Sequence, residues 1–270
     1  MQEFRVRTSH RPRPLPSGRW ALTQRWNDLL FAHWPVDAAG LTHLLPEGLQ
    51  LDTFHGSAWV GITPFWIDRI KIHGLPLIPG VSCYPEMNLR TYVHEQRSGT
   101  PGIFSFSVDS GNLLAAAVGK LFQHLPCHWA EMRIEQREER EISFFSRRRL
   151  TRHPAVFQAR YRGLGPTRKL AECRSGSLEY FLLERSCLFT RDRSGQTLRA
   201  NLHHVAWPLE EAEAEIEQNT LAEAVGIHLP NEQPVLHYAR RMAIYIWPAE
   251  LVLPNIAAQP VQVAVRTANS

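Results

Sequence analysis

Short runs rich in aromatic and β-branched residues alternate with glycine, proline and asparagine about every 8 to 15 residues along this chain. This spacing is typical of an antiparallel sheet or barrel, because each run can form one strand and each break can turn the chain. We therefore predict a mainly β (α+β) fold. The expected strands are residues 29–34, 49–54, 57–65, 87–93, 102–108, 141–147, 155–161, 177–183 and 242–247.

Helices are expected at only three places. Val36–Leu45 lies between two prolines, and Ser110–Phe122 would begin at Asp109 or Ser110 as its N-cap. The third, Pro208–Val225, starts with proline and concentrates glutamates in its first turns, where the helix dipole favours negative charge. This acidic helix is expected to present a solvated face.

Composition places the chain among soluble globular proteins, with 270 residues of which 44% are hydrophobic and 21% charged. We predict that residues 1–19, rich in Arg and Pro, form a flexible arm and that residues 20–270 form a single domain. No apolar run reaches the roughly 18 residues of a membrane span, and the N-terminus has no apolar signal-peptide core. The four cysteines form no CxxC pair, so reduced thiols and a cytoplasmic location are expected.

The net charge of +4 and the pI near 9.0 raise the question of nucleic-acid binding. Of the 30 basic residues, 3 are lysines and 27 are therefore arginines, scattered and interleaved with acids. This distribution argues against a nucleic-acid-binding protein. An interaction module for nucleic acid or protein stays open as an alternative, using the basic stretch Arg147–Arg174 or the acidic segment from Pro208.

The run YPEMNLRTYV has an unusual polar face. A period of two aligns a carboxylate, an amide, a guanidinium and a phenol: Glu86, Asn88, Arg90 and Tyr92. Either this row meets solvent while the opposite face packs in the core, or it lines the lumen of a closed barrel and contacts a small ligand. The next predicted strand carries small hydroxyl side chains that would leave room for a ligand, Ser105 and Ser107.

Several segments together resemble one known family over nearly the whole chain. They are LLFAHWPVD, LLPEGLQLDTFHGSAWVGITPF, PEMNLRTYV, LPCHWAEM, GSLEYFLLER and HHVAWPLEEAE. The chain resembles the YqjF-like domain family of unknown function, which is remotely similar to acetoacetate decarboxylase. That resemblance implies a closed antiparallel β-barrel with an interior cavity and two or three short helices. It implies a fold more firmly than a reaction.

The decarboxylase forms a Schiff base between a lysine and a substrate ketone. By resemblance, Lys120 would be the nucleophile, Glu86 a proton-transferring group, and Arg25 a residue that binds a carboxylate. The decarboxylase has two adjacent lysines, whereas Gly119 and Leu121 flank Lys120, and Arg25 is offset by one position. A surface lysine near the end of a helix is the alternative for Lys120, because a cation suits the C-terminal dipole.

Other motifs for metal or cofactor binding are weak. His124 and His128 have the spacing of a helix face, but Pro126 interrupts that helix and no third ligand follows at a recognisable spacing. His203 and His204 are adjacent, so at most one can enter a cavity from a strand. Neither GxGxxG nor GxxxxGK[ST] occurs. We therefore predict no metal and no cofactor.

The sequence favours a protein that binds a small polar or anionic carbonyl-type molecule in a barrel cavity. The expected contacts are Arg25, Glu86, Asn88, Arg90, Tyr92, Ser105 and Ser107. The alternative is a lyase that acts on a keto acid through Lys120 and Glu86. The expected partner is a small molecule, without membrane or nucleic acid, and a homo-oligomer is left open.

Overall fold

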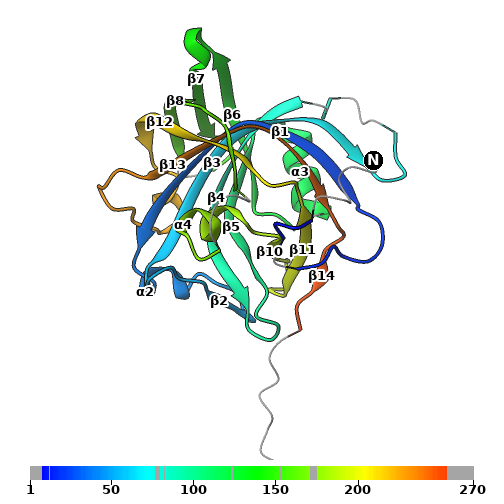
Figure 1. Ribbon diagram of the computed structural model, residues 1–270. Helices are drawn as coiled ribbons and strands as arrows, with labels where there is room; N and C mark the ends of the chain where they lie inside the picture. The colour runs from blue at the N-terminus through cyan, green and yellow to red at the C-terminus, as the bar shows by residue number, and fades with distance from the viewer. Residues whose placement is uncertain are drawn as a thin grey trace, which may run out of the picture.

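The computed structural model describes residues 8–253 apart from 12, 77–79, 82, 123, 152–153 and 171–174. Strands dominate the fold (Figure 1). They are β1 (Leu22–Val36), β2 (Leu49–Leu51), β3 (Ala58–Ile72), β4 (Cys83–Glu95), β5 (Pro101–Ser110), β6 (Cys127–Gln136), β7 (Ile142–Arg148), β8 (Val156–Gly163), β9 (Arg168–Lys169), β10 (Cys187–Arg191), β11 (Thr197–His203), β12 (Pro208–Asn219), β13 (Val235–Ile246) and β14 (Glu250–Leu251). The helices are α2 (Ala39–Thr42), α3 (Leu113–Phe122) and α4 (Leu178–Leu183), with 3₁₀ turns η1 (Glu138–Arg140) and η3 (Glu223–Val225).

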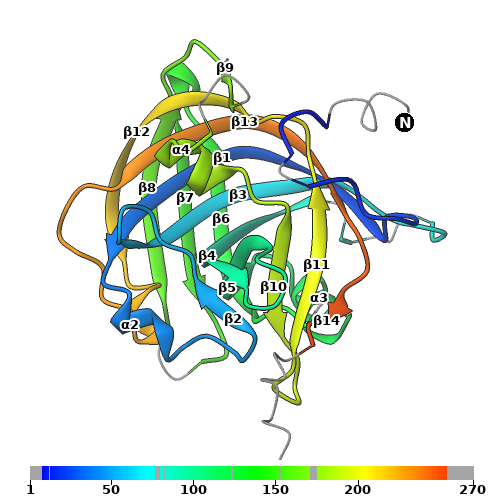
Figure 2. The same cartoon turned by 60° about the horizontal axis from the view of Figure 1, so that its bottom comes forward.

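Nine strands of the described chain close into a barrel in the order β5, β6, β7, β8, β12, β13, β1, β3 and β4. A second ring of paired strands shares part of this barrel. In it, β5 pairs with β10, β10 pairs with β11, and β11 pairs with β13. Figure 2 shows β10 and β11 standing on one side of the curved wall that β13, β1 and β3 form. The five strands from β13 to β5 therefore belong to both rings, which we call the large barrel and the small ring.

The predicted closed β-barrel with short helices is confirmed, but it is mixed rather than wholly antiparallel. β5 pairs in parallel with both β6 and β10. A parallel pair needs a crossover connection, and α3 supplies it between β5 and β6. The helix packs against both of these strands and so comes to lie at the small ring. No described helix has the length and apolarity that a membrane crossing requires.

The shared wall is buried on both faces, which explains its nearly continuous apolar sequence. On β1, Leu30 and Ala32 pack in the core of the large barrel, whereas Leu29 and Phe31 pack in a second core within the small ring. All four are at most 1% exposed. The interior of the large barrel is thus filled by side chains, and free space is found on the other face of the wall.

A bulge at Asp28 keeps β1 aligned with both cores. The residue has φ 50°, and the β1 to β3 register shifts after Asn27. Its carboxylate accepts hydrogen bonds from the hydroxyl of Tyr238 (2.5 Å) and the indole of Trp66 (2.9 Å). Because of the extra residue, Trp26 and Leu29 lie in the same core although they are three positions apart.

The acidic segment Pro208–Val225 is not the helix predicted from its glutamates. Residues 208–219 form β12, since the sequence EEAEAEIE also alternates with a period of two. Ala212 and Ile216 pack against the large-barrel core. The glutamates on the other face pair with two arginines of β8, and Arg160 lies 2.7 Å from Glu215. These cross-strand pairs and the apolar packing outweigh the intrinsic helix propensity of alanine and glutamate.

Other boundaries also differ from expectation. Residues 177–183, predicted as a strand, form α4, and the Ser177 side chain caps it by accepting a hydrogen bond from the Tyr180 backbone N–H (3.2 Å). The helix expected over Val36–Leu45 shrinks to the four residues of α2. α3 begins at Leu113 rather than near Ser110, because the Asn112 side chain, 2.9 Å from the Ala115 backbone nitrogen, is its cap.

Candidate functional site

A cavity of about 320 Å³ lies inside the small ring, under α3. We call it the α3 cavity. Its wall is built from β1, β3, β4, β5, β10, β11 and β13, and the helix contributes Leu114, Ala115, Val118 and Gly119. Most of the lining is apolar, including the indole groups of Trp26 and Trp247. Such a lining suits a small molecule with a largely hydrocarbon body.

A few polar groups converge in this apolar lining. They are Gln24 of β1, Glu86 and Asn88 of β4, Ser105 and Ser110 of β5, and Thr190 of β10. Glu86 and Ser110 are direct cross-strand partners, as are Asn88 and Val108. One carboxyl, two amides and three hydroxyls therefore face the same space. No lysine or arginine of the described residues lines it.

Glu86 is the residue of the α3 cavity best suited to hydrogen bonding with a ligand. Burial among apolar neighbours raises its pKa to about 8, against a smaller lowering by the Asn88 side chain. Its carboxyl is therefore largely protonated at neutral pH and can donate an O–H hydrogen bond. The Asn88 side-chain oxygen is buried without a hydrogen-bond partner. The pair beside the cavity thus includes one acceptor that no neighbouring donor satisfies.

Two further ionisable groups lie near this carboxyl. Burial raises the pKa of the Tyr84 phenol and of the Cys127 thiol, and the charge of Glu86 raises both further. Each residue lines the α3 cavity in its neutral form at neutral pH. The cavity is consequently uncharged at neutral pH apart from the minor ionised fraction of Glu86.

The structure separates the polar row predicted on β4 into two parts. Glu86 and Asn88 line the α3 cavity, whereas Arg90 and Tyr92 are 5% and 0% exposed and lie deeper in the wall. Arg90 stands over the Phe31 ring at 5.5 Å and borders a hollow of only about 20 Å³. The reading in which this row faces solvent is therefore wrong. Arg90 and Tyr92 do not line the larger cavity.

Arg25 and Ser107 also point away from the α3 cavity. Arg25 makes a two-bonded ion pair with Asp68 of β3, on the face opposite Gln24. Ser107 is fully buried, because a register shift beside Arg90 leaves Ser105 rather than Ser107 facing the cavity. Of the predicted contacts, the α3 cavity brings together three residues of two neighbouring strands: Glu86, Asn88 and Ser105.

Lys120 is exposed on the side of α3 that faces away from the α3 cavity. It borders a separate, more open groove of about 300 Å³ with His124, Arg191 and Arg193. The expected helix is present. Of the residues at helical spacing before Lys120, Ala116 is buried, whereas Ala117 and Leu113 are exposed, Leu113 at 56%. His124 and His128 lie in a loop and on β6, so they do not share the helix face considered from their spacing.

Gln24 and Thr190 were missed as cavity residues by sequence reasoning. Gln24 could have been found, because it lies two positions from Trp26 on the same face of β1. Thr190 had no comparable signal, since β10 was not predicted and joins the wall through a parallel pairing with β5. Parallel partners are set by the crossover rather than by local sequence.

Two sequence comparisons identify relatives of this chain. Residues 23–243 match the profile of the family DUF2071, described as an uncharacterized conserved protein. The uncharacterized protein YqjF of Bacillus subtilis (strain 168) is 42% identical over 234 residues, which cover 87% of this chain and 93% of that protein.

Solved structures share the fold at low sequence identity. The acetoacetate decarboxylase of Legionella pneumophila (subsp. pneumophila str. Philadelphia 1) matches with a TM-score of 0.61 and 14% identity, covering 94% of this chain and 96% of that one. An acetoacetate decarboxylase-like enzyme from Sphingomonas wittichii RW1 matches at 0.59 and 15%, covering 88% and 95%. The enduracididine biosynthesis enzyme MppR, complexed with the condensation product of pyruvate and imidazole 4-carboxaldehyde, matches at 0.62 and 10%, covering 87% and 90%.

Proposed function

Because the chain belongs to the DUF2071 family and has an acetoacetate decarboxylase-like fold, we propose that its α3 cavity binds a small, largely apolar molecule carrying a carbonyl oxygen. The observation that carries this proposal is the Glu86 carboxyl, whose pKa burial raises to about 8, in an apolar cavity of about 320 Å³. Its O–H would donate to the ligand carbonyl, with the Asn88 amide beside it. The absence of a lining cation among the described residues favours a neutral ligand over an anionic one.

The proposal does not include a Schiff base. The three lysines of the chain, Lys71, Lys120 and Lys169, are all exposed, and none lines the α3 cavity. We also propose a cytoplasmic location. It is supported by the free thiols of Cys83, Cys127 and Cys187.

Calorimetric titration with 2-octanone tests the binding proposal. Ala115→Phe is expected to abolish binding by filling the cavity, whereas Ala117→Phe on the exposed face of α3 should bind as wild type. Glu86→Leu should weaken binding about tenfold through loss of one hydrogen bond, and Glu86→Gln should retain most of it because an amide still donates. Equal affinity of wild type and Ala115→Phe would place the ligand elsewhere, and no binding by wild type would reject this ligand class.

Proton transfer at carbon is a second candidate function, favoured by the pKa of about 8 at Glu86. The ionised carboxylate would remove a proton from the carbon next to the carbonyl, which leaves an enolate and a protonated carboxyl. This carboxyl would exchange its proton with the solvent and then return a hydrogen to the same carbon, which restores the ketone and the carboxylate. In deuterated water, this exchanges the α-hydrogens of 2-octanone for deuterium.

We expect the exchange rate above background to rise through about pH 8, as Glu86 ionises, and to fall to background in Glu86→Gln. Mass spectrometry of the recovered ketone measures the exchange. The cavity-filling variant Ala115→Phe is the control, because any exchange that it retains takes place outside the cavity. If Glu86→Gln exchanges as fast as wild type, the site binds without this chemistry.

A further inference from the structure

A second cluster of ionisable groups lies outside the α3 cavity, where the N-terminal segment passes the end of β11. His10, Glu184 and His204 each direct one ligand atom toward the others, and these atoms all lie within 4.8 Å of one another. The side chains of His10 and Glu184 are 4% and 1% exposed, and His204 is 4% exposed. The three side chains are therefore largely buried.

Glu184 is poorly satisfied for so buried a carboxyl. One of its oxygens lies 3.8 Å from Nε2 of His10, and the other, Oε2, has no hydrogen-bond partner. A buried carboxyl normally has partners for both oxygens, because leaving one unpaired costs free energy. This unpaired oxygen lies beside two imidazoles, so the three side chains together offer oxygen and nitrogen ligands to a cation.

The hydrogen bonds of the two histidines indicate which ring nitrogen is open to a metal. Nε2 of His10 lies 2.9 Å from the His204 carbonyl oxygen and donates to it, so the lone pair of this ring is on Nδ1 unless a metal replaces that bond. Nδ1 of His204 lies 2.7 Å from the carbonyl oxygen of Val205 and donates to it, so the lone pair of this ring is on Nε2.

We propose that His10, Glu184 and His204 form a binding site for a divalent transition-metal ion, with zinc the best match. Two imidazoles and one carboxylate are a common zinc ligand set, and three protein ligands leave a position for water or another ligand. No local sequence motif predicts the site, because its ligands come from the N-terminal segment, the residue after α4 and the residue after β11.

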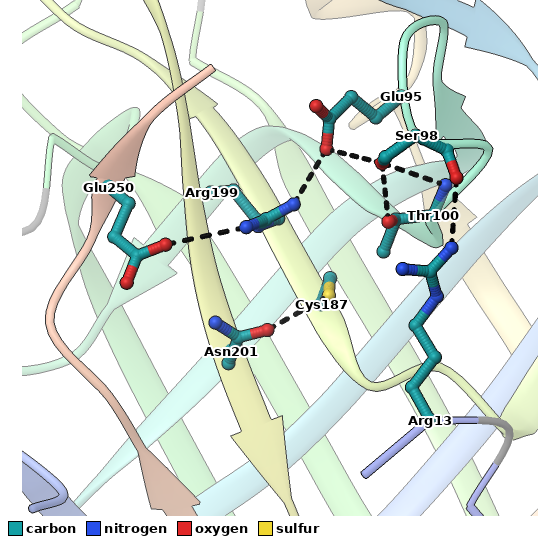
Figure 3. Close-up of polar contacts among 8 residues, drawn as sticks. All are labelled: Arg13, Glu95, Ser98, Thr100, Cys187, Arg199, Asn201 and Glu250. Atoms are coloured by element: carbon teal, nitrogen blue, oxygen red, sulfur yellow. Dashed lines mark hydrogen bonds and ion pairs between the residues drawn. The ribbon is translucent and has the colours of Figure 1, made fainter. Parts of the chain in front are cut away.

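The site would fasten the N-terminal segment to the barrel. His10 reaches it beside two further contacts of this segment: Arg11 donates to the Leu202 carbonyl oxygen (2.7 Å) and Arg13 donates to the Ser98 carbonyl oxygen (2.9 Å). Figure 3 shows Arg13 reaching the turn between β4 and β5, next to the ion pairs of Arg199. Metal bound to His10 would add a link that only the folded protein can make.

Titration of the full chain with Co²⁺ and Zn²⁺ tests this inference. Wild type is expected to bind one ion per chain, with Co²⁺ giving visible absorption bands of a site with nitrogen and oxygen ligands. Zn²⁺ should also raise the Tm.

His10→Ala and Glu184→Gln should each lower affinity for Zn²⁺ at least about tenfold, in line with the loss of one ligand. His228→Ala, which removes an exposed histidine outside the cluster, should bind as wild type. Circular dichroism establishes that each variant is folded, and His10 lies outside the barrel strands. The inference is overturned if folded wild type binds no metal, or if His10→Ala retains both the Co²⁺ bands and the affinity.

Discussion

Replacing Asp109 with alanine is expected to lower the free energy of unfolding by about 3–5 kcal/mol. Asp109 is the penultimate residue of β5 and accepts two hydrogen bonds from Arg148 of β7, at 2.7 and 3.1 Å, with both side chains at most 4% exposed. The variant leaves the guanidinium buried without its carboxylate, which is the costly outcome for such a pair. Denaturant unfolding followed by circular dichroism measures the loss.

The double variant Asp109→Leu with Arg148→Met supplies the control. It removes both charges and replaces them with apolar side chains, so we expect it to regain most of the stability that Asp109→Ala loses. Recovery would show that the uncompensated charge, rather than loss of side-chain packing, is responsible. A double variant as unstable as Asp109→Ala would instead assign the effect to packing between β5 and β7.

Raising the pH from about 4.5 to about 8 is expected to reduce the stability contributed by two buried carboxyls, Glu86 and Glu184. Burial raises the pKa of each from 4.5 in the unfolded chain to about 8 in the folded protein. The folded state therefore binds more protons across this interval. Their contribution is fully present below about pH 4.5 and lost as pH rises through about 8, by at most about 1.4 kcal/mol per pH unit for each group.

The glutamine variants isolate this effect, because an amide does not titrate. Subtracting the pH profile of Glu86→Gln or Glu184→Gln from that of wild type should leave a curve that declines over this interval and is flat beyond it. Urea unfolding at half-unit pH steps gives both profiles. A flat difference curve would mean that the carboxyl in question has an ordinary pKa in the folded protein.

The barrel was predictable because strand runs and turn residues alternate clearly. The secondary structure of two segments was not predictable from their own apolar pattern. Residues 208–219 combine helix-favouring glutamate and alanine with strand periodicity, and their arginine partners on β8, Arg160 and Arg162, decide between the two. α4 was taken for a strand because an apolar run alone has no clear period. The cap at Ser177 was the local signal that could have identified the helix.

The candidate site was predictable only along single strands. Alternation on β4 placed Glu86 and Asn88 on one face, and both line the α3 cavity. It could not reveal that the cavity ends before Arg90, since that depends on how the core packs. Resemblance alone suggested Lys120, but the side of α3 that faces the cavity carries Ala115 and Val118 instead. His10 and Glu184 meet only in the folded protein.

The pairing of β1 with β13 has a consequence for synthesis of the protein. It joins Leu22 to Ile246, so both rings stay open until β13 has left the ribosome. Until then, β1 has an unpaired edge that other strands can join. Nascent chains that end before β13 should therefore bind chaperones that recognise exposed apolar strands. The chaperones should dissociate in a single late step, when β13 pairs with β1 and both rings close.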